Sequence, residues 1–329
     1  MVKYSVIVRT HDEGEELRKT VDSVLKQSIH DWEMILLDDG SGEETRKIAD
    51  ECGQLDSRIR VIHQENKGAI GVFLRGVKES KGEYIGLLDA GDYYDAAFLS
   101  EADRILSRED EKIDMILFGL REVFSDHEDI FFLDTQESYY DTRELFCIME
   151  RTISFFGLAL RVTRRSVFAY TEKEKEFYEE VGNSGNFGED LYLLAPILRN
   201  CRRVYVSHQP LYNYVYDAYS LSHYFPSYTW EDAWNRNRLL GFVYRTMDQC
   251  GWLDEELTNY IRRHVITLLA PCAKWIVRHF VRDREVQRRF RKDAFFNQVV
   301  AKGGFGKDII KEGKSRFAIR LFCMRVRFL

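Results

Sequence analysis

Paired cysteines are missing from this sequence. Its six cysteines stand singly along 329 residues, and no two form a C-x-x-C motif or another metal-ligand spacing. This absence argues against a zinc module and a disulfide framework, and it favours buried thiols in a reducing compartment. The sequence also has no internal repeat and no low-complexity segment.

Long apolar runs are missing as well. No uninterrupted apolar stretch approaches the roughly 20 residues that a membrane-spanning helix needs. The first residues, Met-Val-Lys-Tyr, lead straight into a predicted strand and lack the long apolar core of a signal peptide. We therefore expect a cytoplasmic protein with one large domain or two smaller ones.

The formal charge of −6 conceals two regions of opposite sign. Residues 274–329 contain 16 Lys and Arg against 5 Asp and Glu, whereas the rest of the chain is acidic. Bulky apolar side chains alternate with these cations, which is typical of a helix lying on the inner, anionic face of a membrane. A helix that packs onto the acidic body or onto a partner subunit explains the composition equally well. We expect no nucleic-acid binding, because the basic residues form no recognisable module.

Strand-like and helix-like patterns alternate through the first half of the chain. Short apolar runs predict strands at residues 4–9, 32–37, 58–63, 84–88 and 114–119. Between them apolar side chains recur at helical spacing, as with Leu17, Val21 and Val24. This alternation predicts parallel pairing with right-handed crossovers, and therefore an open α/β sheet. Beyond about residue 225 the pattern becomes helical, so we expect a first part at 1–225 and a helical, basic second part at 226–329.

Two carboxylates directly follow one of the predicted strands. Asp89 and Asp92 come after the apolar run 84–88, where the strand would have its carboxyl end. Open α/β sheets bind ligands at that edge, and Mg²⁺ or Mn²⁺ prefers oxygen ligands. The cluster predicts a metal site that would bring a diphosphate with it. An acidic turn that caps the following helix is the alternative.

A series of segments resembles glycosyltransferase family 2, the inverting, nucleotide-sugar-dependent class with the GT-A fold. The segments are 4–12, 20–28, 37–41, 66–68 with Arg75, 89–92, 188–190, 210–214 and 220–222. The resemblance covers roughly residues 3–222 and depends on the order and spacing of all these segments. It implies a Rossmann-like, mostly parallel open sheet with flanking helices, followed by the helical C-terminal region.

The resemblance implies a nucleoside pocket at two neighbouring strand ends. Asp38 and Asp39 lie in a D-D-G-S run, where a carboxylate can accept from the imide N–H of uracil, and Thr10 and Asp12 would line the same pocket. The alternative is local: these are also ordinary turn and helix-cap residues, Thr10 and Asp12 for the helix that contains Leu17.

Lys67 and Arg75 are the expected contacts to the diphosphate. Their positive charges would balance its negative charge, and Arg75 matches a helix position of the family. Exposed lysines and arginines are common, so a plain surface role is the alternative for both.

The expected metal is Mn²⁺ or Mg²⁺. The resemblance implies Asp89 and Asp92 as its ligands, with His223 as a possible third and Ser222 beside the donor; a surface histidine is the alternative for His223. Many relatives carry an acidic residue where this chain has Gly91. The usual Asp-x-Asp spacing is therefore lost, which leaves open whether Asp89 or Asp92 is the main ligand.

The candidate general base is Asp190, in the segment Gly-Glu-Asp that resembles the family's catalytic segment. It would accept the proton of the acceptor hydroxyl, while its neighbour Glu189 would orient the acceptor or hold the loop. Acidic residues also favour the first turn of a helix, and both interpretations can hold together.

The resemblance implies an inverting glycosyltransferase that uses a nucleotide sugar, with a UDP-sugar as the expected donor. The acceptor would be a hydroxyl of a glycan or a lipid-linked molecule in cell-surface polysaccharide synthesis. The alternative is a non-catalytic member of the same fold that binds a nucleotide or a glycan within an assembly, and Gly91 favours that alternative.

Overall fold

The computed structural model describes residues 2–108, 112–149, 157–181, 189–216 and 230–254, together with Arg284, Arg288 and Lys292. The chain divides into two compact units, Met1–His223 and Tyr224–Leu329, which are described separately. Ser222, His223 and almost all of 274–329 lie outside the described residues. The donor, metal and membrane contacts that the sequence predicts there stay predictions.

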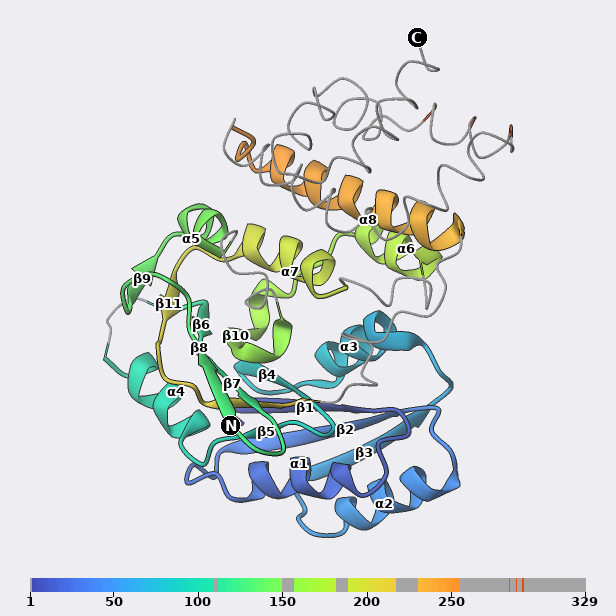
Figure 1. Ribbon diagram of the computed structural model, residues 1–329, viewed down its shortest axis with the longest axis vertical. Helices are drawn as coiled ribbons and strands as arrows, with labels where there is room; N and C mark the ends of the chain where they lie inside the picture. Colours follow the sequence, from blue (N-terminus) through green and yellow to red (C-terminus); the bar gives the residue numbers. More distant parts are fainter. Residues whose placement is uncertain are drawn as a thin grey trace. The chain divides into compact units, whose positions relative to one another are not determined.

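A sheet of eight described strands forms the centre of the first unit, in the order β3-β2-β1-β4-β10-β6-β11-β9 (Figure 1). The strands are β1 (Tyr4–Thr10), β2 (Trp32–Asp39), β3 (Ile59–Gln64), β4 (Tyr84–Asp89), β6 (Met115–Leu117), β9 (Ser138–Tyr140), β10 (Arg161–Arg164) and β11 (Val204–Val206). β1 to β4 are parallel to one another, as is β11 to β6, while β10 and β9 are antiparallel to their neighbours. The predicted open, mostly parallel α/β sheet is confirmed.

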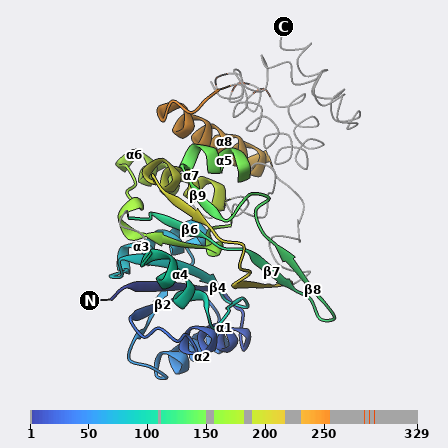
Figure 2. The same cartoon turned by 90° about the vertical axis from the view of Figure 1, so that its left-hand side faces the viewer.

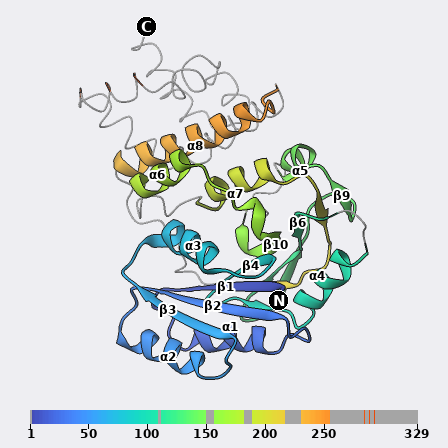
Figure 3. The same ribbon diagram turned by 180° about the vertical axis from the view of Figure 1, so that it is seen from behind.

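Helices cover both faces of this sheet (Figures 1 and 3). The described helices of the first unit are α1 (Glu16–Leu25), α2 (Glu43–Gly53), α3 (Gly68–Glu79), α4 (Phe98–Leu106), α5 (Thr142–Met149), α6 (Glu172–Val181), which packs on α3, and α7 (Glu189–Asn200), with the short 3₁₀ turns η2 (Leu158–Leu160) and η3 (Arg165–Val167). α1 and α2 lie on one face of β1, β2 and β3, and α3 lies on the other. Val6, Ile7 and Val8 of β1 are consequently fully buried, which explains why this strand is apolar on both sides.

A second sheet has the order β5-β12-β7-β8 in the described part of the first unit. Its strands are β5 (Tyr93–Tyr94), β7 (Leu120–Val123), β8 (Glu128–Phe131) and β12 (Tyr212–Val215). Figure 2 shows β7 and β8 as a hairpin that extends to one side of the large sheet. β4 ends at Asp89 and β5 begins at Tyr93, so the short turn of residues 90–92 joins the two sheets.

In the second unit the structure describes one long helix, α8 (Trp230–Gln249). Leu239, Val243 and Met247 recur four residues apart along it and are all buried, so the helix has one apolar face. Among the residues described in both units, no helix combines the length and the apolar character needed to cross a membrane.

Gly76 lets α3 lie close to the sheet. A Cβ atom at this position would lie 2.6 Å from Ile7 Cγ2, 2.9 Å from Ile7 Cδ1 and 3.1 Å from Leu37 Cδ1. Such distances are too short for carbon atoms in contact, so a side chain here would push α3 away from β1 and β2.

We expect Gly76→Ala to lower the free energy of unfolding by about 1–3 kcal/mol, the usual cost of overpacking a core. This cost opposes the gain of about 1 kcal/mol that Ala normally has over Gly in a helix. Urea unfolding measures the net change in the free energy of unfolding. In an Ile7→Ala background, where both crowding atoms of that side chain are gone, Gly76→Ala should cost less. An equal cost in the two backgrounds would show that the close contact is not the cause.

Candidate functional site

The candidate residues gather where the strand order of the large sheet reverses. β2 and β3 lie on one side of β1, and β4 lies on the other. Ligands of open α/β sheets bind outside the carboxyl ends of the strands at such a reversal. Register places Arg9 opposite Asp89 and Thr10 opposite Asp38, so the ends of three parallel strands meet at this edge.

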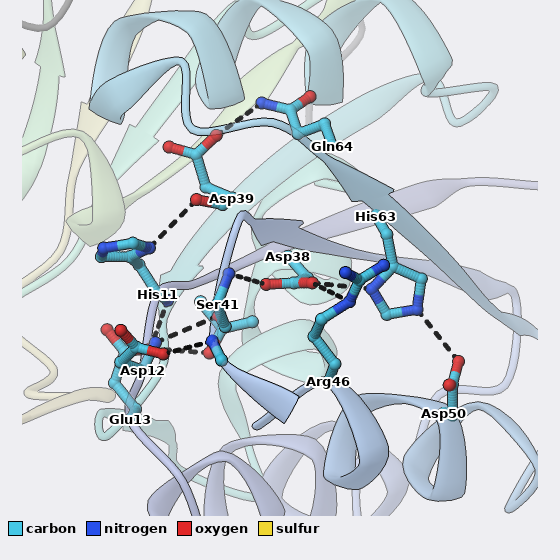
Figure 4. A network of polar contacts seen from close by, with 12 residues as sticks. His11, Asp12, Glu13, Asp38, Asp39, Ser41, Arg46, Asp50, His63 and Gln64 are labelled. Atoms are coloured by element: carbon cyan, nitrogen blue, oxygen red, sulfur yellow. Dashed lines mark hydrogen bonds and ion pairs between the residues drawn. The ribbon is translucent and has the colours of Figure 1, made fainter. Parts of the chain in front are cut away.

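Asp38, near the end of β2, is completely buried. Its Oδ1 accepts from the backbone N–H of Ser41 at 2.9 Å, and its Oδ2 lies 2.7 Å from His63 Nδ1 and 3.7 Å from Arg46 Nε (Figure 4). Burial acts to raise the pKa of Asp38, but the hydrogen bonds from Ser41 and His63 outweigh it and lower that pKa below its ordinary value. Asp38 is therefore a charged, internal carboxylate that fixes the loop after β2.

The ring of His63 lies between two carboxylates. Its Nδ1 faces Asp38, and its Nε2 lies 3.0 Å from Asp50 Oδ1 on α2 (Figure 4). Burial acts to lower the pKa of His63, but the hydrogen bonds to the two carboxylates prevail and raise it. The His63 ring thus ties the end of β2 to β3 and α2.

Asp39 forms the N-terminal cap of α3 from outside the helix. Its Oδ1 accepts from the backbone N–H of Lys67 at 2.8 Å and from Gln64 Nε2 at 2.7 Å, and its Oδ2 accepts from the backbone N–H of Gly68 at 2.8 Å. The first amide groups of a helix have no partners within the helix, so this carboxylate satisfies two of them. Helix capping, the alternative role given for Asp39, is therefore present in the structure. The helix that Asp39 caps is α3 and not the one that directly follows it in the chain. The contact of Asp39 with uracil stays a prediction.

Asp12 connects the loops after β1 and β2. Its Oδ1 accepts from the backbone N–H of Gly42 at 2.7 Å, directly before α2, and its own N–H donates to Ser41 Oγ at 3.1 Å (Figure 4). Asp12 adopts φ +72°, a left-handed conformation that Asp tolerates better than most residues. Thr10 is buried, and its hydroxyl donates to Glu13 at 2.6 Å. Asp12 thus contributes to the start of α2 and not to the start of the helix that contains Leu17.

The two predicted phosphate contacts have different surroundings. Lys67 is exposed at the N-terminus of α3, next to the Asp39 cap. Arg75 is also exposed, but its Nε lies 3.0 Å from Glu79 Oε1 one helical turn further along α3. The structure therefore brings Lys67 to the strand ends, whereas it shows Arg75 in an ion pair within its own helix.

Asp89, the last residue of β4, pairs with Arg9 of β1. Arg9 Nε lies 2.5 Å from Asp89 Oδ1, and the two side chains are 16% and 38% exposed. The pair is thus accessible at the edge of the sheet but partly enclosed. Arg9 was not among the residues predicted from the sequence.

Two residues of β12, in the second sheet, donate hydrogen bonds to Asp92. Its Oδ2 accepts from the Tyr212 hydroxyl at 2.5 Å, and its Oδ1 accepts from the backbone N–H of Val215 at 2.9 Å. Burial, and then the charge of Asp89, raise the pKa of Asp92 to about 7. The turn before it depends on Gly91, which has φ +97°, a conformation that residues with a side chain rarely adopt.

These residues do not fit a divalent metal ion as they stand. One oxygen of Asp89 is occupied by a guanidinium, and both oxygens of Asp92 already accept from protein donors. Within the described ranges no three His, Cys, Asp or Glu side chains gather in a way that could hold a metal ion. The metal roles of Asp89 and Asp92 therefore stay predictions.

Asp190, at the start of α7, interacts electrostatically with Arg9 and Asp89. Its Oδ1 is buried and no described group donates to it, while the backbone N–H of Leu158 bonds to the carboxyl group. Burial raises the pKa of Asp190 to about 6, with Arg9 and Arg161 acting to lower it and Asp89 acting to raise it. A carboxyl group with such a pKa can take up a proton near neutral pH. Glu189 begins α7, and its side chain is outside the described part.

Arg161 is a second arginine that sequence reasoning missed. It is only 2% exposed, and it donates to the backbone carbonyl of Gly157. Burial, opposed by the charge of Asp190, lowers the pKa of Arg161 to about 10. Arg9 had a usable signal, because it is a charged residue directly after the buried run of β1. Arg161 had none, since β10 was not predicted.

A model of the glycosyl transferase family 2 domain matches residues 5–170, just over half of the chain. The chain therefore belongs to glycosyltransferase family 2.

Two relatives from Bacillus subtilis (strain 168) illustrate the similarity. The uncharacterized glycosyltransferase EpsJ is 33% identical over 122 residues, which are 37% of this chain and 35% of EpsJ. TuaG, a putative teichuronic acid biosynthesis glycosyltransferase, is 37% identical over 89 residues, which are 27% of this chain and 35% of TuaG. The matched part of the chain thus spans about a third of the length of each of these relatives.

The fold is similar to that of a solved structure, S. aureus TarS 1-349 in complex with UDP-GlcNAc. The TM-score is 0.62 at 17% sequence identity, and the match covers 93% of this chain and 81% of that one. This similarity confirms the predicted GT-A fold.

The Asp39 cap gives a prediction for stability. Asp39→Ala removes the acceptor for the first amide groups of α3, so we expect the free energy of unfolding to fall by about 1–2 kcal/mol. Asp39→Asn keeps one acceptor oxygen and should lose less. Urea unfolding of both variants provides the measurement. The control is Asp31→Asn, at an exposed position directly before β2 and thus at the other end of that strand from Asp39. If Asp39→Ala and Asp31→Asn had equal stability, the cap would contribute nothing.

Proposed function

We propose that this chain is an inverting glycosyltransferase that transfers a sugar from a nucleotide sugar to an acceptor hydroxyl. The observation that carries the proposal is the enclosed carboxyl group of Asp190, which interacts electrostatically with Asp89 and Arg9 at the strand-order reversal. The proposal therefore puts a proton acceptor beside a charged ligand at the edge where this kind of sheet binds ligands. Membership of glycosyltransferase family 2 supports the reaction class.

In the proposed reaction Asp190 is the general base. The acceptor oxygen attacks the anomeric carbon of the donor from the face opposite the diphosphate, and the bond from that carbon to the phosphate oxygen breaks. The hydroxyl proton passes to Asp190, and the electron pair of the broken bond leaves with the nucleoside diphosphate. Proton transfer to a positioned base of this kind contributes typically about 10²–10⁴-fold to a rate.

The proposed donor is a UDP-sugar, with a hexosyl or N-acetylhexosaminyl group. TarS, which has the same fold, was solved with UDP-GlcNAc, and this supports the choice. In the proposed pose the nucleoside lies beside Asp39, whose Oδ2 has a single donor among the described residues, and next to Thr10 and Asp12. Asp38 would support this loop from within, since it is fully buried.

The proposed acceptor is a hydroxyl of a glycan or of a lipid-linked molecule in cell-surface polysaccharide synthesis. TuaG, which is similar to this chain over part of its length, is described as a putative teichuronic acid biosynthesis enzyme. The predicted dependence on Mg²⁺ or Mn²⁺ is not part of the proposal, because Asp89 and Asp92 are engaged by protein groups.

A non-catalytic protein that binds a nucleotide or glycan is the second candidate. The occupied oxygens of Asp92 and the glycine at position 91 favour it, because they remove acidic ligands expected in a catalytic site. The two candidates differ in turnover. Incubation with UDP-, GDP- and dTDP-sugars, with and without glycan acceptors and Mn²⁺, should release nucleoside diphosphate above background. No release with any donor, together with measurable nucleotide binding, would favour the second candidate.

The assigned base gives a prediction for activity. We expect Asp190→Asn to lower kcat at least 100-fold, because the amide cannot accept the proton, while UDP affinity stays within about threefold. The matched control is Asp31→Asn, which should keep full activity. Full activity of Asp190→Asn would remove Asp190 from the mechanism.

The pH dependence follows from the raised pKa of Asp190. The base acts in its charged form, which is lost as the pH falls through about 6. We expect kcat/KM to be constant above that pH and to fall roughly tenfold per pH unit well below it. Initial rates between pH 4.5 and 8.5, in buffers of constant ionic strength, measure the profile. A profile that is flat down to the ordinary pKa of an aspartate would contradict the assignment.

A further inference from the structure

One arginine lies among three carboxylates at the carboxyl ends of β1 and β4. Arg9 is paired with Asp89 at 2.5 Å, and its positive charge also acts on Asp92 and Asp190. Strand register explains the arrangement, because Arg9 and Asp89 occupy paired positions on adjacent parallel strands and therefore point to the same face. The guanidinium is held by the two central strands of the sheet and not by a loop.

The carboxylates that a divalent ion would need are engaged by protein groups. A metal ion on Asp89 would share that carboxylate with the guanidinium of Arg9. Two cations bound to one carboxylate repel each other strongly in a partly buried site. Asp92 would have to give up the Tyr212 hydroxyl and the Val215 amide, which join the two sheets. Position 91 is a glycine, so the turn between Asp89 and Asp92 offers no further carboxylate.

A guanidinium is chemically suited to the diphosphate itself. It is always protonated, and its N–H groups form a planar fork that binds phosphate oxygens in pairs. Because the pair of Arg9 and Asp89 is partly enclosed, its electrostatic interactions are stronger than in bulk water.

We infer that Arg9 supplies the positive charge that binds the donor diphosphate, so that donor binding and sugar transfer need no added divalent ion. The inference depends on the proposed function, since it concerns the same nucleotide-sugar site. As the bond between the anomeric carbon and the phosphate oxygen breaks, the electron pair remains on the departing diphosphate. Arg9 stabilises that charge while it keeps its own proton, and Asp89 holds the guanidinium in place.

The first measurement is UDP affinity of the full chain by isothermal titration calorimetry, in excess chelator and then with Mn²⁺ or Mg²⁺. We expect the Kd of the unaltered chain to change less than twofold between these conditions. Arg9→Gln should weaken UDP binding at least tenfold in chelator, and Arg9→Lys should lose less, because it keeps a point charge but not the fork. Arg60→Gln, which removes a cation paired with Glu79 on β3 and α3, is the matched control and should bind UDP normally.

Thermal unfolding shows whether each variant is folded, and nucleoside diphosphate release shows whether turnover follows binding. If chelator weakened UDP binding of the unaltered chain tenfold or more and Mn²⁺ restored it, the inference would be overturned while the proposed function would stand. Equal UDP affinity of folded Arg9→Gln and the unaltered chain would overturn it too. If the unaltered chain bound no UDP, GDP or dTDP with or without metal, the proposed function itself would fail.

Discussion

β1 hydrogen-bonds in parallel to β2 on one side and to β4 on the other, and the arrangement of the candidate site depends on this double pairing. It places the strand-order reversal beside β1 and brings Arg9 level with Asp89. It also requires α3 to cross to the opposite face of the sheet from α1 and α2, which the missing side chain of Gly76 permits at close range. Fold and site are therefore set by the same backbone contacts.

The carboxyl groups at this edge of the sheet differ in the direction of their pKa shifts. Asp38 keeps its negative charge because Ser41 and His63 bind it, whereas Asp92 and Asp190 have raised pKa values because burial outweighs the groups around them. The carboxylates near β2 thus serve mainly to hold loops and helix ends. Those near β4 are the ones whose protonation state can change close to neutral pH, which is the property expected of groups that act on a substrate.

The sequence was sufficient to predict the parallel part of the fold. Strands such as β1 and β2 are continuous apolar runs, and helical spacing separates them, so local pattern and final structure agree. The second sheet and β10 could not be predicted, because their strands contain only two to four residues and are defined by partners distant in the chain. Local pattern carries no information about such partners.

The candidate site shows the same division. Asp89 and Asp190 were identified from their motifs, and the structure gives them linked electrostatic surroundings. The partners that decide what these carboxylates can do were not identified: Arg9 acts through strand register, and Tyr212 lies 120 positions away from Asp92 in the chain. Sequence motifs identify the acidic residues, but their partners in the folded chain determine which carboxylates can still bind a ligand.

The turn at Gly91 also bears on how this site can change by mutation. A side chain added there would meet no atom within 4 Å, so the obstacle is the backbone conformation and not a lack of space. Asp and Asn are the residues that tolerate such a conformation best after glycine. A single Gly91→Asp exchange would therefore add a carboxylate between Asp89 and Asp92, at the cost of some local strain.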